Sequence, residues 1–272
     1  KQSKNLKVRQ KKIKKDLVKQ LPKNIKKVKK KKYYQTFMQK EMIKMFNISK
    51  YEDLMKKLVS TGLKPTTNWN EKLTSNSLLL RHDIDFSIEF AHQLALAESR
   101  VKICSTFFFM LTSNMYNPLS AHNQKLIKSI ADMGHKVSLH FDPTVYESLE
   151  YFLYEKNIFE NIFNQKIDIV SIHQPGLFLN NNDITLSGTP QTYQDVFFKR
   201  MKYISDSNGR DIFPQITKYL EEPRELGLHL LIHPIWWMGI GGNPTETCNA
   251  LRAQILNFNT KYFRTNCLTY TE

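Results

Sequence analysis

The sequence predicts an α/β fold in which parallel strands, wrapped by helices, form a barrel. Short β-rich runs alternate with helical runs along most of the 272 residues, and about seven such repeats fit within roughly 200 residues. Several apolar runs also end in a polar group, as strands of a parallel barrel do at the face that carries the active site.

Hydrophobic periodicity separates the strands from the helices. The pattern of residues 34–62 predicts two amphipathic helices, which we expect to pack on the main domain. A connecting loop rich in Pro, Thr and Asn follows them. The later strands are expected at 77–84, 103–111, 136–141, 167–172, near 197–204 and near 227–232; the helices between and after them are expected at 88–99, 120–133, 145–164, near 211–222 and near 246–262.

The positive charge of the chain is concentrated at its start. Residues 1–32 contain 16 Lys and Arg and one acidic residue, Asp16, so this stretch carries the whole net charge of +15. Its apolar residues recur every three or four positions, which predicts a cationic amphipathic helix. Two interpretations remain open: an arm that lies on an anionic membrane surface, or a solvated linker helix. Nucleic acid is not an expected partner, because the stretch lacks interleaved aromatic residues.

The cysteines and the hydropathy pattern limit the cellular setting. Cys104, Cys248 and Cys267 are widely spaced, which favours neither a disulfide framework nor a cysteine zinc site. The sequence has neither the run of about 18 apolar residues of a spanning helix nor the apolar core of a signal peptide. A reducing, cytoplasmic location is therefore expected.

Six polar residues stand at or just after the ends of predicted strands, and we expect them to converge at one edge of the sheet. They are Asp83, Asp85, His140, His173, Asp206 and His233. A single buried histidine is more often a structural residue than a ligand, but five strand ends with the same feature favour a site. The alternation of a strand puts Asp83 and Asp85 on one side, where a divalent ion would relieve their repulsion. One carboxylate and two imidazoles form the open ligand set of hydrolytic metals.

The motifs "RHDIDFS", "GHKVSLHFDP" and "LLIHPIWW", in this order, resemble the polysaccharide deacetylases of the NodB-homology group over residues 76–240. The resemblance implies a distorted (β/α)7 barrel preceded by N-terminal helices. The expected organisation is a basic amphipathic arm at 1–32, a helical extension and linker at 33–75, and the deacetylase-like barrel at 76–272.

The resemblance also implies roles for single residues. Asp83 would be the catalytic base, Asp85 and His140 would bind a divalent metal, most simply Zn²⁺, and His233 would protonate the leaving amine. The sequence departs from the family pattern at Thr144, where a second histidine is expected, so the third ligand would be His173, with Asp142 in reserve.

Four further residues are candidates for substrate binding. Gln174 stands where the family has an arginine, and Asp206 lies near the family's fourth motif. Trp236 and Trp237 follow His233 and would form either a rim that stacks on sugar rings or a hydrophobic plug; aromatic faces suit the apolar faces of sugars, which favours the rim.

Together these features predict a metal-dependent hydrolase that removes N-acetyl groups from an amino sugar in bacterial surface polysaccharide biosynthesis. Its partner would be an N-acetylated sugar or glycan, and residues 1–32 would place it at the inner face of the membrane. Two alternatives stay open. One is a catalytically silent sugar-binding barrel or membrane-associated assembly factor, and the other is a hydrolase of another sugar amide, such as N-formyl.

Overall fold

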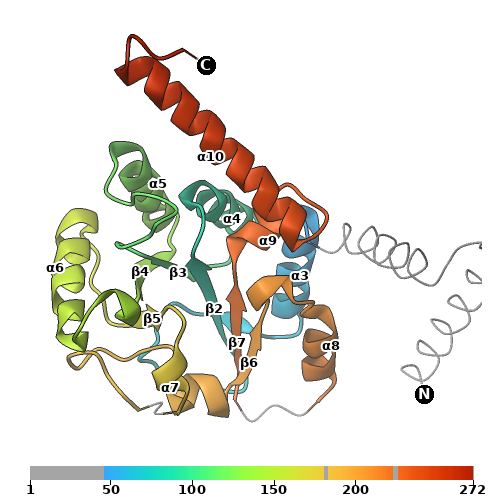
Figure 1. Ribbon diagram of the computed structural model, residues 1–272. Helices are drawn as coiled ribbons and strands as arrows, with labels where there is room; N and C mark the ends of the chain where they lie inside the picture. The colour runs from blue at the N-terminus through green and yellow to red at the C-terminus, as the bar shows by residue number, and fades with distance from the viewer. Residues whose placement is uncertain (1–45, 181–182, 223–225, 272) are drawn as a thin grey trace, which may run out of the picture. The chain divides into compact units, whose positions relative to one another are not determined.

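A parallel β-sheet forms the centre of the computed structural model, which describes residues 46–180, 183–222 and 226–271 (Figure 1). The strands are β1 Lys64–Pro65, β2 Ser77–Ile84, β3 Thr106–Phe109, β4 Lys136–Phe141, β5 Val170–Ile172, β6 Lys202–Ser205 and β7 Leu228–Ile232. They pair in the order β5-β4-β3-β2-β7-β6, with β1 beside β2, and every pair is parallel. The predicted parallel α/β fold is confirmed.

Strand β2 lies in the middle of the sheet, and all eight of its residues are buried. Because successive side chains of a strand point to opposite faces, β2 contributes to two hydrophobic clusters. Leu80 and Ile84 join the main core beneath the helices. Leu79 joins a smaller cluster with Trp69 and Phe108. This smaller cluster fills the inner side of the sheet, below the polar residues that follow Leu79 on the same face.

Contacts across the sheet show that it curls into part of a barrel. Two strands separate β2 from β5, so the pair would lie roughly 14 Å apart in a flat sheet. Nevertheless, Ser171 Oγ of β5 donates a hydrogen bond of 3.0 Å to Asp83 Oδ1 of β2, and both side chains are short. No ladder joins β5 to β6 within the described ranges, so the barrel is open between these two strands.

The helices pack around this sheet, and several begin at a polar capping residue. They are α3 Ile48–Ser60, α4 Ile88–Arg100, α5 Ala121–Asp132, α6 Phe152–Phe163, α7 Gly176–Asn180, α8 Phe213–Glu221, α9 Pro234–Met238 and α10 Pro244–Asn266. The side chains of Asn47, Ser87, Ser120 and Asn243 accept hydrogen bonds from backbone N–H groups in the first turns of α3, α4, α5 and α10. These helix starts therefore follow from local sequence.

Two predicted elements differ most from the structure, and the strands expected at 103–111 and 167–172 are shorter, Thr106–Phe109 and Val170–Ile172. The helix expected at 145–164 begins at Phe152, because two 3₁₀ turns, Pro143–Val145 and Leu149–Tyr151, come before it. The strand expected near 197–204 covers only Lys202–Ser205, and Val196–Arg200 forms a π-helical turn. A short apolar run fits either a strand or a helical turn. In the structure Phe197 of this turn is buried in the smaller cluster.

Helix α3 belongs to the same compact unit as the sheet. Its buried face includes Tyr51, Leu54 and Leu58, which join the main core. Of the two helices expected over 34–62, α3 is the second; the first, like the basic arm at 1–32, lies outside the described residues. None of the helices in the described part of the chain is both long enough and apolar enough to cross a bilayer.

A fully buried carboxylate, Glu98 on α4, ties α3 and α4 to the sheet. It accepts hydrogen bonds from the hydroxyl of Tyr51, from His82 Nε2 at 2.8 Å and from Ser105 Oγ at 2.5 Å. His135 Nδ1 lies 3.4 Å from its second oxygen. Burial opposes ionisation, but His82 and His135 outweigh it, so the pKa of Glu98 lies below its usual value.

We expect Glu98→Ala to lower the free energy of unfolding by about 3–5 kcal/mol, because it leaves several buried donors without an acceptor. Urea denaturation followed by circular dichroism measures this loss. The control is Glu221→Ala on α8, which replaces an exposed glutamate. A loss at Glu98 no larger than at Glu221 would contradict this account of the cluster.

Candidate active site

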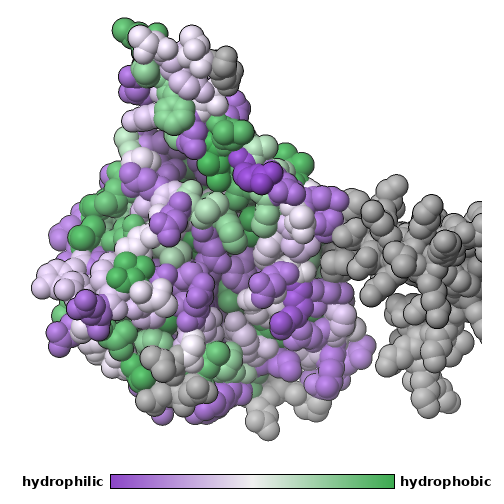
Figure 2. Space-filling model, viewed as in Figure 1, coloured by the Kyte–Doolittle hydropathy of each residue, from purple (hydrophilic) through white to green (hydrophobic). Residues whose placement is uncertain are grey.

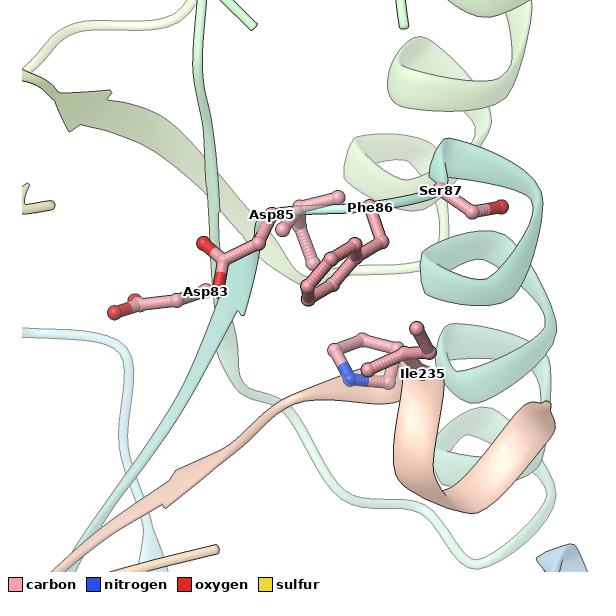
Figure 3. Close-up of a pocket in the computed structure, with 7 residues that line it drawn as sticks. Asp83, Asp85, Phe86, Ser87 and Ile235 are labelled. Atoms are coloured by element: carbon pink, nitrogen blue, oxygen red, sulfur yellow. The ribbon is translucent and has the colours of Figure 1, made fainter. Parts of the chain in front are cut away.

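Two carboxylates at the carboxyl end of β2 begin the site. Asp83 and Asp85 project from the same side of the strand, away from Phe86 and Ile235 (Figure 3). The strand alternation that the sequence predicts is thus observed. His82 points the other way, where its ring contacts Glu98 and the carbonyl of Ile232.

Arg81 holds Asp83 in place from the same strand. Arg81 Nε lies 2.8 Å from Asp83 Oδ1, and Nη2 lies 2.6 Å from Oδ2, so the guanidinium binds the carboxylate through two hydrogen bonds. Nη2 also donates to Ser171 Oγ and to the hydroxyl of Tyr193. Burial works against ionisation of Asp83, but Arg81 and His140 outweigh it and hold the pKa of Asp83 well below its usual range.

Sequence analysis missed the role of Arg81. The resemblance pointed to the position of Gln174, after β5, as the place of an arginine, whereas Gln174 is exposed and has a left-handed φ of 46°. The available signal was spacing: Arg81 stands two residues before Asp83 and therefore shares its side of the strand. A substrate contact for Gln174 stays a prediction.

Histidines from two other strands meet these carboxylates. His140, at the end of β4, has Nε2 at 3.2 Å from Asp85 Oδ1 and 3.9 Å from Asp83 Oδ2. His233, just after β7, has Nε2 at 3.7 Å from Asp85 Oδ2. The curl of the sheet therefore brings together four of the six predicted residues, with Asp85 between the two imidazoles.

His173 lies beside this group but bonds elsewhere. Its ring is 5.3 Å from that of His140, centroid to centroid, while its Nδ1 lies 3.0 Å from Asp142 Oδ2. The other oxygen of Asp142 accepts hydrogen bonds from the backbone N–H and the hydroxyl of Thr144, at 2.9 and 2.6 Å. Asp142 thus connects His173 to Thr144.

The expected three-ligand metal centre is only partly assembled. No group of three or more His, Cys, Asp or Glu side chains is arranged to hold a metal ion within the part of the chain that the structure describes. Asp85 and His140 are the expected donors that lie in contact, and Asp85 Oδ1 is buried without a hydrogen-bond partner. This pair suits a divalent ion in its donor chemistry, but the full set does not form.

Asp206 orients His233. The carboxylate is completely buried and accepts hydrogen bonds from His233 Nδ1 at 2.6 Å, from the His233 backbone and from Trp237 Nε1 at 2.8 Å. Burial disfavours the charged imidazole, but the hydrogen bond to Asp206 and the Asp206 charge outweigh it and raise the pKa of His233 to about 9. His233 is therefore protonated at neutral pH, with Nε2 turned toward Asp85.

These contacts correct two expected substrate contacts. Asp206 is 0% exposed and its oxygens bond His233 and Trp237, so it supports the site from below. Trp237 is 2% exposed and packs edge-on against Phe46 and Tyr51, so it is the hydrophobic plug and not the sugar rim. Trp236 is partly buried beside Phe86, and its role stays a prediction.

Two cavities lie near residues of the site. A cavity of about 10 Å³ borders Asp83, Asp85 and Ile235, which is close to the volume that one water molecule needs. A larger cavity of about 450 Å³ lies between the segments that follow β4 and β5, lined in part by Thr144, Tyr146 and Gln174. The larger cavity has the volume of a small-molecule site.

We expect Asp206→Asn to lower the pKa of His233 from about 9, because burial persists while the nearest carboxylate charge is removed. Titration of the ring by NMR, in chelator-treated protein, measures this value. The exposed ring of His122 is the internal reference, and an unchanged His233 titration would contradict the assignment.

Comparison with known proteins gives structural neighbours only. No protein-family model matches the chain, and no curated protein matches it. Among solved structures, a mutant of BA3943 described as a CE4 family pseudoenzyme with restored enzymatic activity is 15% identical, with a TM-score of 0.38, over 69% of this chain and 65% of that one. Wild-type BA3943 from Bacillus anthracis is 14% identical, with a TM-score of 0.36, over 71% and 63%.

The peptidoglycan deacetylase PdaC from Bacillus subtilis is 13% identical, with a TM-score of 0.38, over 75% of this chain and 100% of that one. The chain thus spans slightly less than two thirds of the length of the two BA3943 structures. At these identities and TM-scores, what the chain does has to be argued from its own residues.

Proposed function

We propose that this chain is a carbohydrate deacetylase that hydrolyses the N-acetyl group of an amino sugar in a bacterial surface glycan. One observation carries the proposal: His140 Nε2 lies beside both Asp83 and Asp85, and His233 Nε2 lies 3.7 Å from Asp85 Oδ2, so an ionised carboxylate, Asp83, and a protonated imidazole, His233, belong to one site. Amide hydrolysis uses a base that accepts a proton from water and an acid that protonates the departing amine, and these two groups can supply both.

In the proposed reaction, the oxygen of a water molecule bonds to the amide carbonyl carbon and the carbon–nitrogen bond breaks. Asp83 accepts a proton from the attacking water, and His233 donates a proton to the departing sugar amine. The products are acetate and a free amine. Arg81 keeps the Asp83 carboxylate ionised and fixed in direction, and Asp206 keeps His233 charged with Nε2 toward the site.

A divalent ion, most simply Zn²⁺, is part of this proposal. Asp85 and His140 would hold it, and His173 is the third candidate ligand. Such an ion supplies a Lewis acid that polarises a carbonyl and makes bound water more acidic. Asp142 would then keep the ring of His173 in one tautomer, as carboxylates beside metal-bound histidines do.

The second candidate function is a catalytically silent barrel that binds a sugar or takes part in membrane-associated assembly. Thr144 and Gln174, which depart from the pattern of the resembled deacetylases, and the lack of a complete three-donor group in the described ranges favour it. A hydrolase of another sugar amide, such as N-formyl, would use the same acid and base. In each case we propose a cytoplasmic protein that residues 1–32 bring to the inner face of the membrane by charge attraction.

We expect Asp83→Asn to retain bound metal and to lower hydrolysis at least about 100-fold, because general-base catalysis contributes roughly that much or more. Asp85→Asn is expected to lose both metal and hydrolysis. Metal content by elemental analysis, and acetate release from oligomers of N-acetylated glucosamine, measure the two quantities.

Each outcome separates one function from the others. Equal metal content in the two variants contradicts the assigned roles of the aspartates. Wild-type protein that holds no divalent ion and releases no acetate favours the silent barrel. Metal without acetate release, but with formate release from the N-formyl sugar, favours the alternative hydrolase.

A further inference from the structure

Helix α10 is buried along only its first half. Thr247 and Leu251 are buried, and Leu251 packs with Phe90 and Ile235. Beyond Ile255 every residue of the helix is exposed or nearly so, and the helix extends away from the sheet (Figure 1). The second half of α10 therefore presents its side chains to the surroundings.

The exposed half carries large apolar side chains in a regular pattern. Leu256 is 67% exposed, Phe258 66% and Tyr262 57%, and Phe263 is also exposed. Figure 2 shows hydrophobic residues interspersed with hydrophilic ones on this projecting helix. Phe258 and Tyr262 continue the stripe of Leu251 and Ile255 at spacings of three and four residues, and their rings stack on each other. The apolar face that α10 packs on the sheet unit thus continues beyond that contact.

The charges on this part of the chain are all positive. Lys261 and Arg264 are the ionised residues of the helix beyond Ile255, while Glu246 lies in its first turn and Glu272 follows it in sequence. Lys261 and Arg264 lie to the side of the Phe258 and Tyr262 stripe, as cationic side chains do on helices that lie in a lipid interface.

From this arrangement we infer that the outer half of α10 is a docking surface for an anionic lipid membrane. Leu256, Phe258, Tyr262 and Phe263 enter the boundary between headgroups and acyl chains, while Lys261 and Arg264 contact the anionic headgroups. A second copy of the chain is the alternative occupant of this apolar face, and sedimentation velocity distinguishes it from a membrane.

The test uses the full chain and vesicles of equal parts phosphatidylglycerol and phosphatidylcholine. The double variant Phe258→Ser/Phe263→Ser is expected to lower the partition coefficient about tenfold, since it removes two apolar side chains from the lipid contact. Lys261→Gln/Arg264→Gln is expected to weaken binding to these vesicles but not to vesicles of phosphatidylcholine alone. Cosedimentation measures both.

Residues 1–32 are present in every variant, so binding by that segment cannot explain a difference between them. The matched control is Tyr154→Ser/Ile158→Ser on α6, where both side chains are also exposed, and it should bind within about twofold of the wild type. Hydrogen exchange supplies a local measurement: the amides of 256–266 should become protected when vesicles are added.

Two results would overturn the inference. In the first, the chain binds vesicles while the amides of 256–266 exchange unchanged and Phe258→Ser/Phe263→Ser binds like the wild type. In the second, sedimentation velocity without lipid shows a dimer that the same double variant dissociates, which would assign the apolar face to a second copy of the chain.

Discussion

The buried ion pair between Arg81 and Asp83 is the interaction on which the rest of the structure depends. Arg81 is completely buried, and its guanidinium bonds Asp83 of its own strand, Ser171 of β5 and the hydroxyl of Tyr193. These bonds connect the middle of the sheet to the strand at its edge and to a segment beyond it. Removing one partner of a buried pair costs about 3–5 kcal/mol, because the other charge stays behind without compensation.

The same pair decides which groups of the site are charged. The pKa values of Asp83 and Asp85 both lie below the usual range of carboxyl groups, because Arg81, His140 and His233 surround them. Asp206 plays the corresponding part for His233 from the other side of the site. Two groups of the site are therefore held in their charged forms by buried partners: Arg81 bonds Asp83, and Asp206 bonds His233.

Most of the fold and part of the site could be predicted from sequence. Apolar runs and helix caps are local signals, so β2, β4, β7 and the starts of α4 and α5 lie close to their predicted positions. The convergence of Asp83, Asp85, His140 and His233 followed from a rule about strand ends that depends only on the order of elements.

The rest of the site depends on the directions in which side chains point, which the sequence does not specify. The place of His173 at a strand end was visible, but the turn of its Nδ1 toward Asp142 depends on the loop after β4. The sequence does not distinguish Trp237 and Asp206 from residues that contact a substrate. Their burial results from contacts with α3 and with the end of β7, which are distant in sequence. Arg81 was overlooked because a resemblance pointed to a different position for its role.

The double use of Asp142 has a consequence for how this protein varies among its relatives. One carboxylate holds both Thr144 and His173, so a change at Asp142 removes a partner from both, and a change at either of the other two removes a partner from Asp142. Residues 142, 144 and 173 should therefore covary as a set. In a relative with a histidine at position 144, residue 142 would not accept the hydrogen bond that the Thr144 hydroxyl donates here.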